Sequence, residues 1–88
     1  MTRSEFGAFK RWEIVRVVWL DACGGASLRD PVERAITIQP NTVESVGYFL
    51  GADDLAVRIC GGHEQEETAW DTLVIPISQV LACEKIGP

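Results

Sequence analysis

Residues 12–20 hold the densest apolar pattern in the chain. β-Branched and aromatic side chains dominate this segment, which favours a strand. One alternate set of positions includes Val15, Val17 and Trp19, and the other set is also mostly apolar toward its end. A helix is the competing interpretation, because Trp12, Val15 and Trp19 also share helical spacing. The density of valine and isoleucine favours the strand.

Further strands are predicted along the rest of the chain, each bounded by turn residues. Gly47, inside one of them, indicates a bulge or a sharp bend. Two of them flank the tight turn 51–54, and in the second Leu55, Val57 and Ile59 alternate toward one face. The predicted strands cover residues 36–38, 42–50, 55–60 and 70–75.

The connections between these strands differ in length. Residues 21–35 form a long polar connection with one helical turn at 31–34. Residues 61–67 form a polar, acidic loop. Residues 77–86 leave two alternatives open, a short helix or a 3₁₀ turn at 77–79 followed by a strand.

The order of these elements predicts an all-β fold of five to six short strands without a long helix. Short, bent strands protect their edges by curling into a small barrel. The sequence strand, long loop, strand, hairpin, strand, proline turn, strand resembles an SH3-like barrel, whose last strand follows a 3₁₀ turn. We expect a single domain over residues 1–88, with a loosely held basic head at 1–11 and the barrel at 12–86.

Composition limits the classes of protein that fit. The chain has 88 residues, of which 47% are hydrophobic and 24% charged, as in an ordinary small globular domain. No apolar run approaches the about 20 residues of a membrane span, and charges early in the chain argue against a signal peptide. Three cysteines, an odd number, are expected as free thiols. We therefore expect a cytoplasmic protein.

Charge is distributed unevenly along the chain. The formal net charge is -5, yet residues 1–16 carry four basic and two acidic side chains. An acidic body repels phosphates, so nucleic acid is not the expected partner. The basic head remains able to contact a phosphate or an acidic partner.

Catalytic and metal motifs are weak. Cys60 and His63 are a weak metal candidate, because a strong zinc signal needs a second close pair of ligands. His63 is the single histidine, and no oxyanion donors accompany it. Asp53 and Asp54 fit the role of turn formers better than that of acid and base. We expect no enzyme, no bound metal and no cofactor.

The binding candidates are tryptophans and charged loop residues. Tryptophan is enriched at binding hot spots and also stacks on nucleotide bases. The run of glutamates in the acidic loop offers a negative surface to a basic partner. The candidate binding residues are Trp12, Trp19, Trp70, Lys10, Arg11, Glu64, Glu66 and Glu67.

Three short stretches carry a resemblance to a known group of proteins. They are Trp-Leu-Asp-Ala at 19–22, Ser-Val-Gly-Tyr at 45–48 and Ile-Pro at 75–76. Together they resemble patterns in short uncharacterised tailed-bacteriophage and prophage proteins, over roughly residues 12–86. The resemblance implies a phage-type origin and supplies no catalytic residues, while the loops 23–35 and 63–68 fit its pattern poorly.

These observations lead to a functional expectation. The expected function is that of a non-catalytic, phage-type β-barrel that binds a host or phage protein as an accessory or inhibitor module and self-associates. The alternative is a small nucleotide- or nucleic-acid-binding barrel that uses exposed tryptophan and the basic head.

Overall fold

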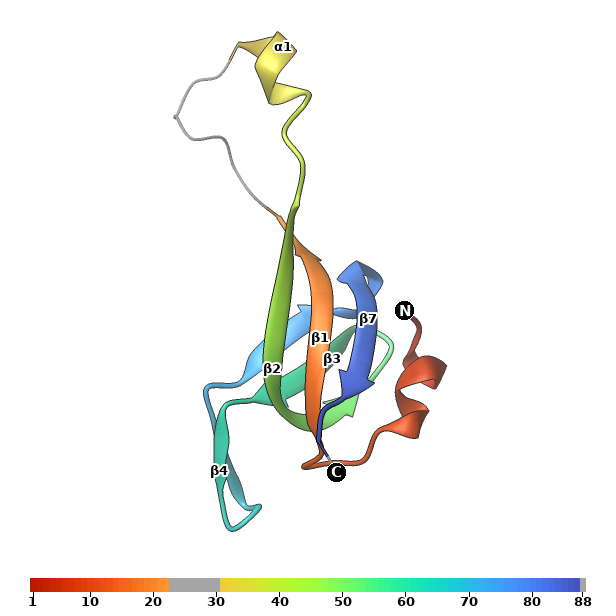
Figure 1. Cartoon of the computed structure of the whole chain (residues 1–88), viewed down its shortest axis with the longest axis vertical. Helices are drawn as coiled ribbons and strands as arrows, with labels where there is room; N and C mark the ends of the chain where they lie inside the picture. The colour runs from red at the N-terminus through yellow and green to blue at the C-terminus, as the bar shows by residue number, and fades with distance from the viewer. Residues whose placement is uncertain (23–30, 88) are drawn as a thin grey trace.

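The computed structural model describes residues 1–22 and 31–87 and has an all-β fold with short helical pieces (Figure 1). Residues 23–30, which include Cys23 and the middle of the predicted connection 21–35, lie outside the described residues. The elements in chain order are η1 (Arg3–Ala8), β1 (Ile14–Asp21), α1 (Val32–Ala35), β2 (Asn41–Ala52), β3 (Ala56–Cys60), β4 (Gly62–Glu64), β5 (Thr68–Trp70), β6 (Leu73–Pro76), η2 (Ile77–Gln79) and β7 (Val80–Lys85).

Five strands form one antiparallel sheet in the order β6-β3-β2-β1-β7. The last strand returns beside the first after the 3₁₀ turn η2, so the second alternative for residues 77–86 is confirmed. This is the strand order of the predicted SH3-like layout. β4 and β5 form a separate two-stranded ribbon where a loop was predicted.

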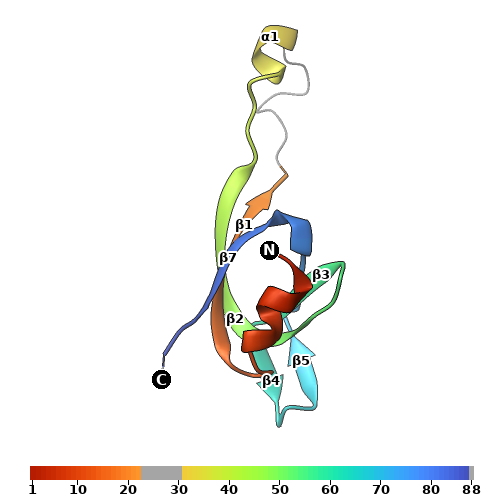
Figure 2. The same ribbon diagram turned by 90° about the vertical axis from the view of Figure 1, so that its right-hand side faces the viewer.

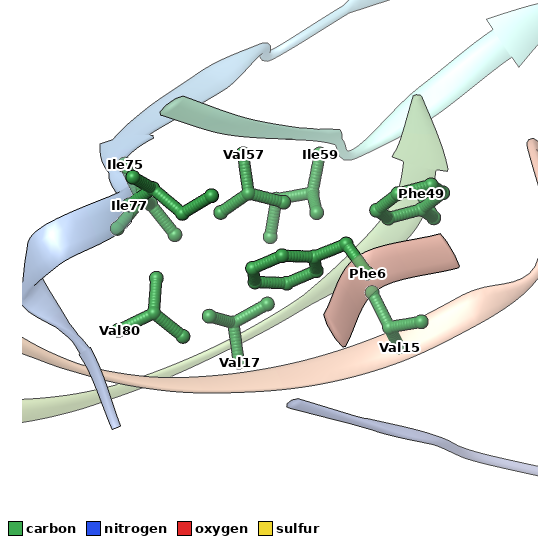
Figure 3. Packing of buried hydrophobic residues seen from close by; sticks show 9 residues of the cluster. All are labelled: Phe6, Val15, Val17, Phe49, Val57, Ile59, Ile75, Ile77 and Val80. Atoms are coloured by element: carbon green, nitrogen blue, oxygen red, sulfur yellow. The ribbon is translucent and has the colours of Figure 1, made fainter. Parts of the chain in front are cut away.

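A single core lies inside the curled sheet, with side chains from η1, η2 and five strands meeting in it (Figure 3). The ring of Phe6 lies between the side chains of β1 and those of β3, and it stacks on Phe49 at a centroid distance of 6.4 Å. The core residues are Phe6, Val15, Val17, Phe49, Val57, Ile59, Ile75, Ile77 and Val80.

The N-terminal head is part of this core, and the expectation of a loosely held terminus is wrong for it. Phe6 is 2% exposed, and the ammonium group of Met1 donates a hydrogen bond to the Val80 carbonyl at 2.8 Å. Burial of the large aromatic side chain of Phe6 outweighs the tendency of the neighbouring charges to stay in water.

β1 confirms the predicted strand, and Val15 and Val17, which share one alternate set of positions, are fully buried. It begins at Ile14, because Trp12 lies in a turn with a φ of 75°. The role of Gly47 differs from the predicted bulge. A Cβ there would lie 2.6 Å from the Cys60 carbonyl oxygen, so glycine allows the close approach of two backbones.

The predicted strand at 36–38 is wrong. Its residues continue the turn of α1, since the amides of Ile36, Thr37 and Ile38 donate to carbonyls three or four residues earlier. Among residues 1–22 and 31–87, these β-branched residues have no neighbouring strand to pair with, and they lie on the extension that carries α1 away from the barrel (Figure 1).

Two other boundaries moved. Leu55, predicted to begin the strand on one face with Val57 and Ile59, is 79% exposed because it lies in the turn between β2 and β3. Trp70, predicted to begin a strand that runs to Ile75, belongs to β5, and β6 starts at Leu73.

Candidate docking surface and adjoining hollows

The side of β1 opposite the core is a candidate functional surface. Ile14, Arg16 and Val18 alternate with the buried valines and therefore lie on that side. Their register partners in β2 and β7 share it, because directly paired residues of antiparallel strands lie on one face. We call this surface the outer face, and its members are Ile14, Arg16, Val18, Glu44, Val46, Tyr48, Glu84 and Ile86.

The outer face exposes several apolar side chains and is not covered by the described helices and strands. Ile14 is 42% exposed, Val46 59% and Ile86 39%. η1, β3 and β5 all lie on the other side of β1 and β2, and no described helix or strand lies over the outer face in either view (Figures 1 and 2). Contiguous exposed apolar side chains on a small domain mark an interaction surface.

The charged side chains of the outer face pair with one another across three strands. Arg16 of β1 contacts Glu44 of β2 at 3.3 Å and Glu84 of β7 at 2.8 Å. The Nε of Arg16 is buried and has no hydrogen-bond partner among the described residues. The three charges sum to one negative charge. A partner could therefore cover the face and leave Arg16 paired with the two glutamates.

An aromatic cluster closes the end of the outer face where β1 begins. The His63 ring lies 4.5 Å from that of Trp12 and 4.9 Å from that of Tyr48, measured between centroids. The Nδ1 of His63 accepts a hydrogen bond from the Glu66 amide. These contacts dock the β4–β5 ribbon against the turn that holds Trp12.

The backbone of that turn is strained at Trp12. A bulky residue with positive φ is an outlier that costs about 1–3 kcal/mol and clusters at functional sites. The Trp12 amide donates to the Phe49 carbonyl at 2.8 Å, which holds the residue in this conformation.

Two hollows flank Arg11 and Trp12. One, of about 480 Å³, lies toward the ribbon and is also lined by Arg58, Glu66 and Glu67. The other, of about 530 Å³, opens on the outer face. It is lined in addition by Lys10, Glu13, Ile14, Tyr48, Lys85 and Ile86.

Glu13 links the basic residues of the second hollow. Its carboxylate contacts the Lys85 ammonium at 2.8 Å and accepts from the Lys10 amide at 2.6 Å. The hydrogen bond from Lys85, then that from Lys10, lower the pKa of Glu13. Lys10, Arg11, Lys85 and Glu13 together leave two positive charges in this corner of an acidic protein.

The structure brings together five of the predicted binding residues and separates the others. Trp19 is half-buried against the core, donates to Ser45 and lines a third hollow of about 330 Å³. Trp70 is 48% exposed on the ribbon, and Glu64 is exposed nearby. Five of the predicted residues line the two hollows beside Arg11 and Trp12. Arg11, Trp12, Glu66 and Glu67 line the first hollow, and Lys10 lines the second together with Arg11 and Trp12.

The weak metal candidate finds no supporting cluster. Cys60 is 1% exposed, and His63 is packed between aromatic rings. Within residues 1–22 and 31–87, no group of three or more His, Cys, Asp or Glu side chains is placed to hold a metal ion. Cys60 and Cys83 are free thiols, and burial raises the pKa of Cys83 to about 11.

Sequence reasoning missed the apolar members of the outer face. The signal was present in residues 12–20, where both alternate sets are apolar although only one enters the core. A small barrel has one core, so a strand that is apolar on both sides packs one side into that core and leaves the other side exposed.

Comparison of the chain with protein-family models, curated proteins and solved structures found no match. Among the described helices, none has the length and apolar character needed to cross a membrane.

Proposed function

We propose that this protein is a non-catalytic binding module that docks a protein through its outer face. The observation that carries the proposal is the group of exposed apolar side chains Ile14, Val46 and Ile86, from adjacent rows on the uncovered side of the sheet. Fully burying a side chain of this size is worth about 1.5–3 kcal/mol, so a few of them suffice to anchor a partner.

The resemblance to tailed-phage proteins supports a host or phage protein as the partner and an accessory or inhibitory role. The glutamates Glu66 and Glu67, exposed beside the docking surface, favour a basic rim on such a partner because unlike charges steer association.

The test is selection of peptides from a displayed library on the immobilised protein, followed by binding measurements on variants. Val46→Asp places a charge in the middle of the outer face and should weaken peptide binding at least about tenfold. Leu55→Asp is the matched control, because Leu55 is more exposed than Val46 and lies off the outer face. Equal binding by both variants would refute the docking surface.

A second candidate function rests on the second hollow, where two net positive charges lie beside the rings of Trp12 and Tyr48. Phosphate near Lys10 and Lys85 and a base on an aromatic ring are the contacts that nucleotide binding requires. Fluorescence titration with ATP and with a short single-stranded oligonucleotide tests it. Quenching should be lost in Trp12→Phe and retained in Trp70→Phe, and unchanged fluorescence in the unmodified protein excludes this function.

A further inference from the structure

We propose that the partner on the outer face is a second copy of this chain, packed face to face about a two-fold axis perpendicular to the strands. This inference rests on the proposed function, since it names the occupant of the same docking surface. In such a dimer the strands of the two copies run in opposite directions, and the end of the face where β1 begins lies against the opposite end of the partner.

The charges of the outer face and of the second hollow, which opens at one end of it, are complementary under this symmetry. Lys10, Arg11 and Lys85 gather where β1 begins, with Glu13 as the one acid lining the same hollow. Glu44 lies two register positions beyond Val46, toward the other end. Paired residues of β7, β1 and β2 form rows across the strands. A two-fold axis that runs between the row of Ile14 and the row of Arg16 places the basic end of each copy against Glu44 of the other.

The side chains at the two ends are available for this contact. Lys10 is exposed, and its ammonium has no ion-pair partner among residues 1–22 and 31–87. Glu44 is 60% exposed at its side chain and contacts Arg16 through Oε1 alone, which leaves Oε2 for a cation from the second copy. Each pair occurs twice in a symmetric dimer.

The middle of the face supplies the attraction. Ile14 and Val46 lie in adjacent rows next to the axis, and the Ile86 amide donates to the Ile14 carbonyl, which holds Ile86 beside them. Packed sheets lie about 10 Å apart with interdigitating side chains, and exposed branched residues fill that space well. Arg16 stays paired with Glu44 and Glu84 of its own chain, so covering it leaves no lone charge.

The net charge of the chain limits the orientations in which two copies can associate. A chain with a net charge of -5 repels its own copies at most orientations. The outer face is the exception, because its basic corner and its carboxylates attract each other when the strands are antiparallel. Self-association is therefore restricted to this one surface and orientation, which favours a closed dimer over open aggregation.

The oligomeric state in solution tests the inference. Sedimentation velocity of the full chain over a concentration series should show a monomer–dimer equilibrium. Val46→Asp should raise the dimer dissociation constant at least about tenfold, whereas Leu55→Asp should leave it within about twofold. Circular dichroism and the thermal midpoint of each variant verify that it remains folded.

A charge exchange tests the orientation. Lys10→Glu should weaken the dimer and reduce its salt sensitivity, and Glu44→Lys should weaken it as well. An equimolar mixture of the two single variants should form a heterodimer tighter than either homodimer, because both repulsive contacts become attractive. The double variant Lys10→Glu/Glu44→Lys should dimerise better than either single variant. A mixture that associates no better than its components overturns the proposed antiparallel dimer.

The outcomes separate this inference from the function on which it rests. A protein that is monomeric at all concentrations but loses selected peptides in Val46→Asp overturns the dimer and retains the docking surface. A monomer that binds no peptide overturns both. A dimer that Val46→Asp leaves intact places self-association elsewhere and overturns the inference.

Discussion

At some positions of this barrel, the residue type is determined by a close approach between two parts of the chain. The alternation of apolar and polar residues along a strand does not reveal these positions. Gly47 is required because the Cys60 carbonyl oxygen occupies the space of a Cβ, and Gly62 is required because the Trp70 ring does the same. Trp12 holds a left-handed backbone without being glycine. Each of these residues lies where two segments of the chain approach closely.

Gly47→Ala should destabilise the protein by about 1–3 kcal/mol, because the new methyl group meets backbone atoms rather than the flexible end of a side chain. Gly7→Ala is the matched control, since nothing lies within 4 Å of a Cβ at Gly7. The control should be neutral or stabilise the protein by up to about 1 kcal/mol. Urea denaturation measures both, and equal effects would contradict the close-approach argument.

Trp19→Ala should destabilise the protein more than Trp12→Ala, by about 3 kcal/mol for Trp19. Trp19 packs against the core and donates from its indole to Ser45 at 3.0 Å. Trp12→Ala loses the contact with His63 but also replaces a bulky residue in a strained turn. Thermal and denaturant unfolding measure the order, and a larger loss for Trp12 would contradict it.

Cys83 gives the protein a sensitivity to alkaline pH. Burial, with a smaller contribution from Glu84, raises the pKa of the thiol from an ordinary value of 9.0 to about 11. The folded state favours the neutral thiol, so its contribution is complete below about pH 9 and is lost between about pH 9 and 11. The thermal midpoint should fall over this range less in Cys83→Ala than in the unmodified protein, and identical slopes would refute this.

At the scale of elements, local hydrogen bonds decide where the strands turn. Both oxygens of the Asp53 carboxylate are engaged in the turn from β2 to β3, one with the amides of Leu55 and Ala56 and the other with Arg58. The hydrogen bond from Ala56, then that from Leu55, lower the pKa of Asp53. The prediction of Asp53 as a turn former is confirmed.

Asp53→Ala should lower the thermal midpoint, whereas Asp54→Ala should change it little, because Asp54 makes only an exposed contact with Arg3 at 3.7 Å. Asp53→Asn keeps an acceptor for the amides and should recover most of the loss. The stabilisation by Asp53 is present at neutral pH and lost as pH falls through its lowered pKa. An Asp53→Ala protein as stable as Asp54→Ala would show that the turn does not need this side chain.

At the scale of the whole molecule, one small core depends on the N-terminal segment. η1 lies over the open side of the curled sheet and inserts Phe6 between β1 and β3 (Figures 2 and 3). A chain of this size has little core to lose, and total stabilities of small domains are about 5–15 kcal/mol.

Phe6→Ala should therefore cost about 3–5 kcal/mol and bring the protein close to unfolding at room temperature. Phe9→Ala, which removes a half-buried ring from the same head, should cost less. Calorimetric unfolding compares the two. A Phe6→Ala variant of nearly unchanged midpoint would mean that the head does not belong to the folded barrel.

The sequence by itself determined the all-β class, the β2–β3 hairpin and the placement of Val15 and Val17 on one side of β1. These features depend on alternation and turn chemistry within a few residues, and Val15, Val17 and Asp53 carry them locally. The same local information misassigned 36–38 and the head, because whether Ile36 pairs or Phe6 is buried depends on which segments come alongside.

The candidate site was decided only by tertiary structure. The sequence named Arg11 and Trp12 from residue type, but their meeting with Glu66 and Glu67 requires the ribbon to dock on the turn through His63. The outer face likewise exists because curling the sheet gives one side of β1 a core and leaves the other without cover. Alternation sorts residues onto two sides, and only the curvature of the whole sheet decides which side meets water.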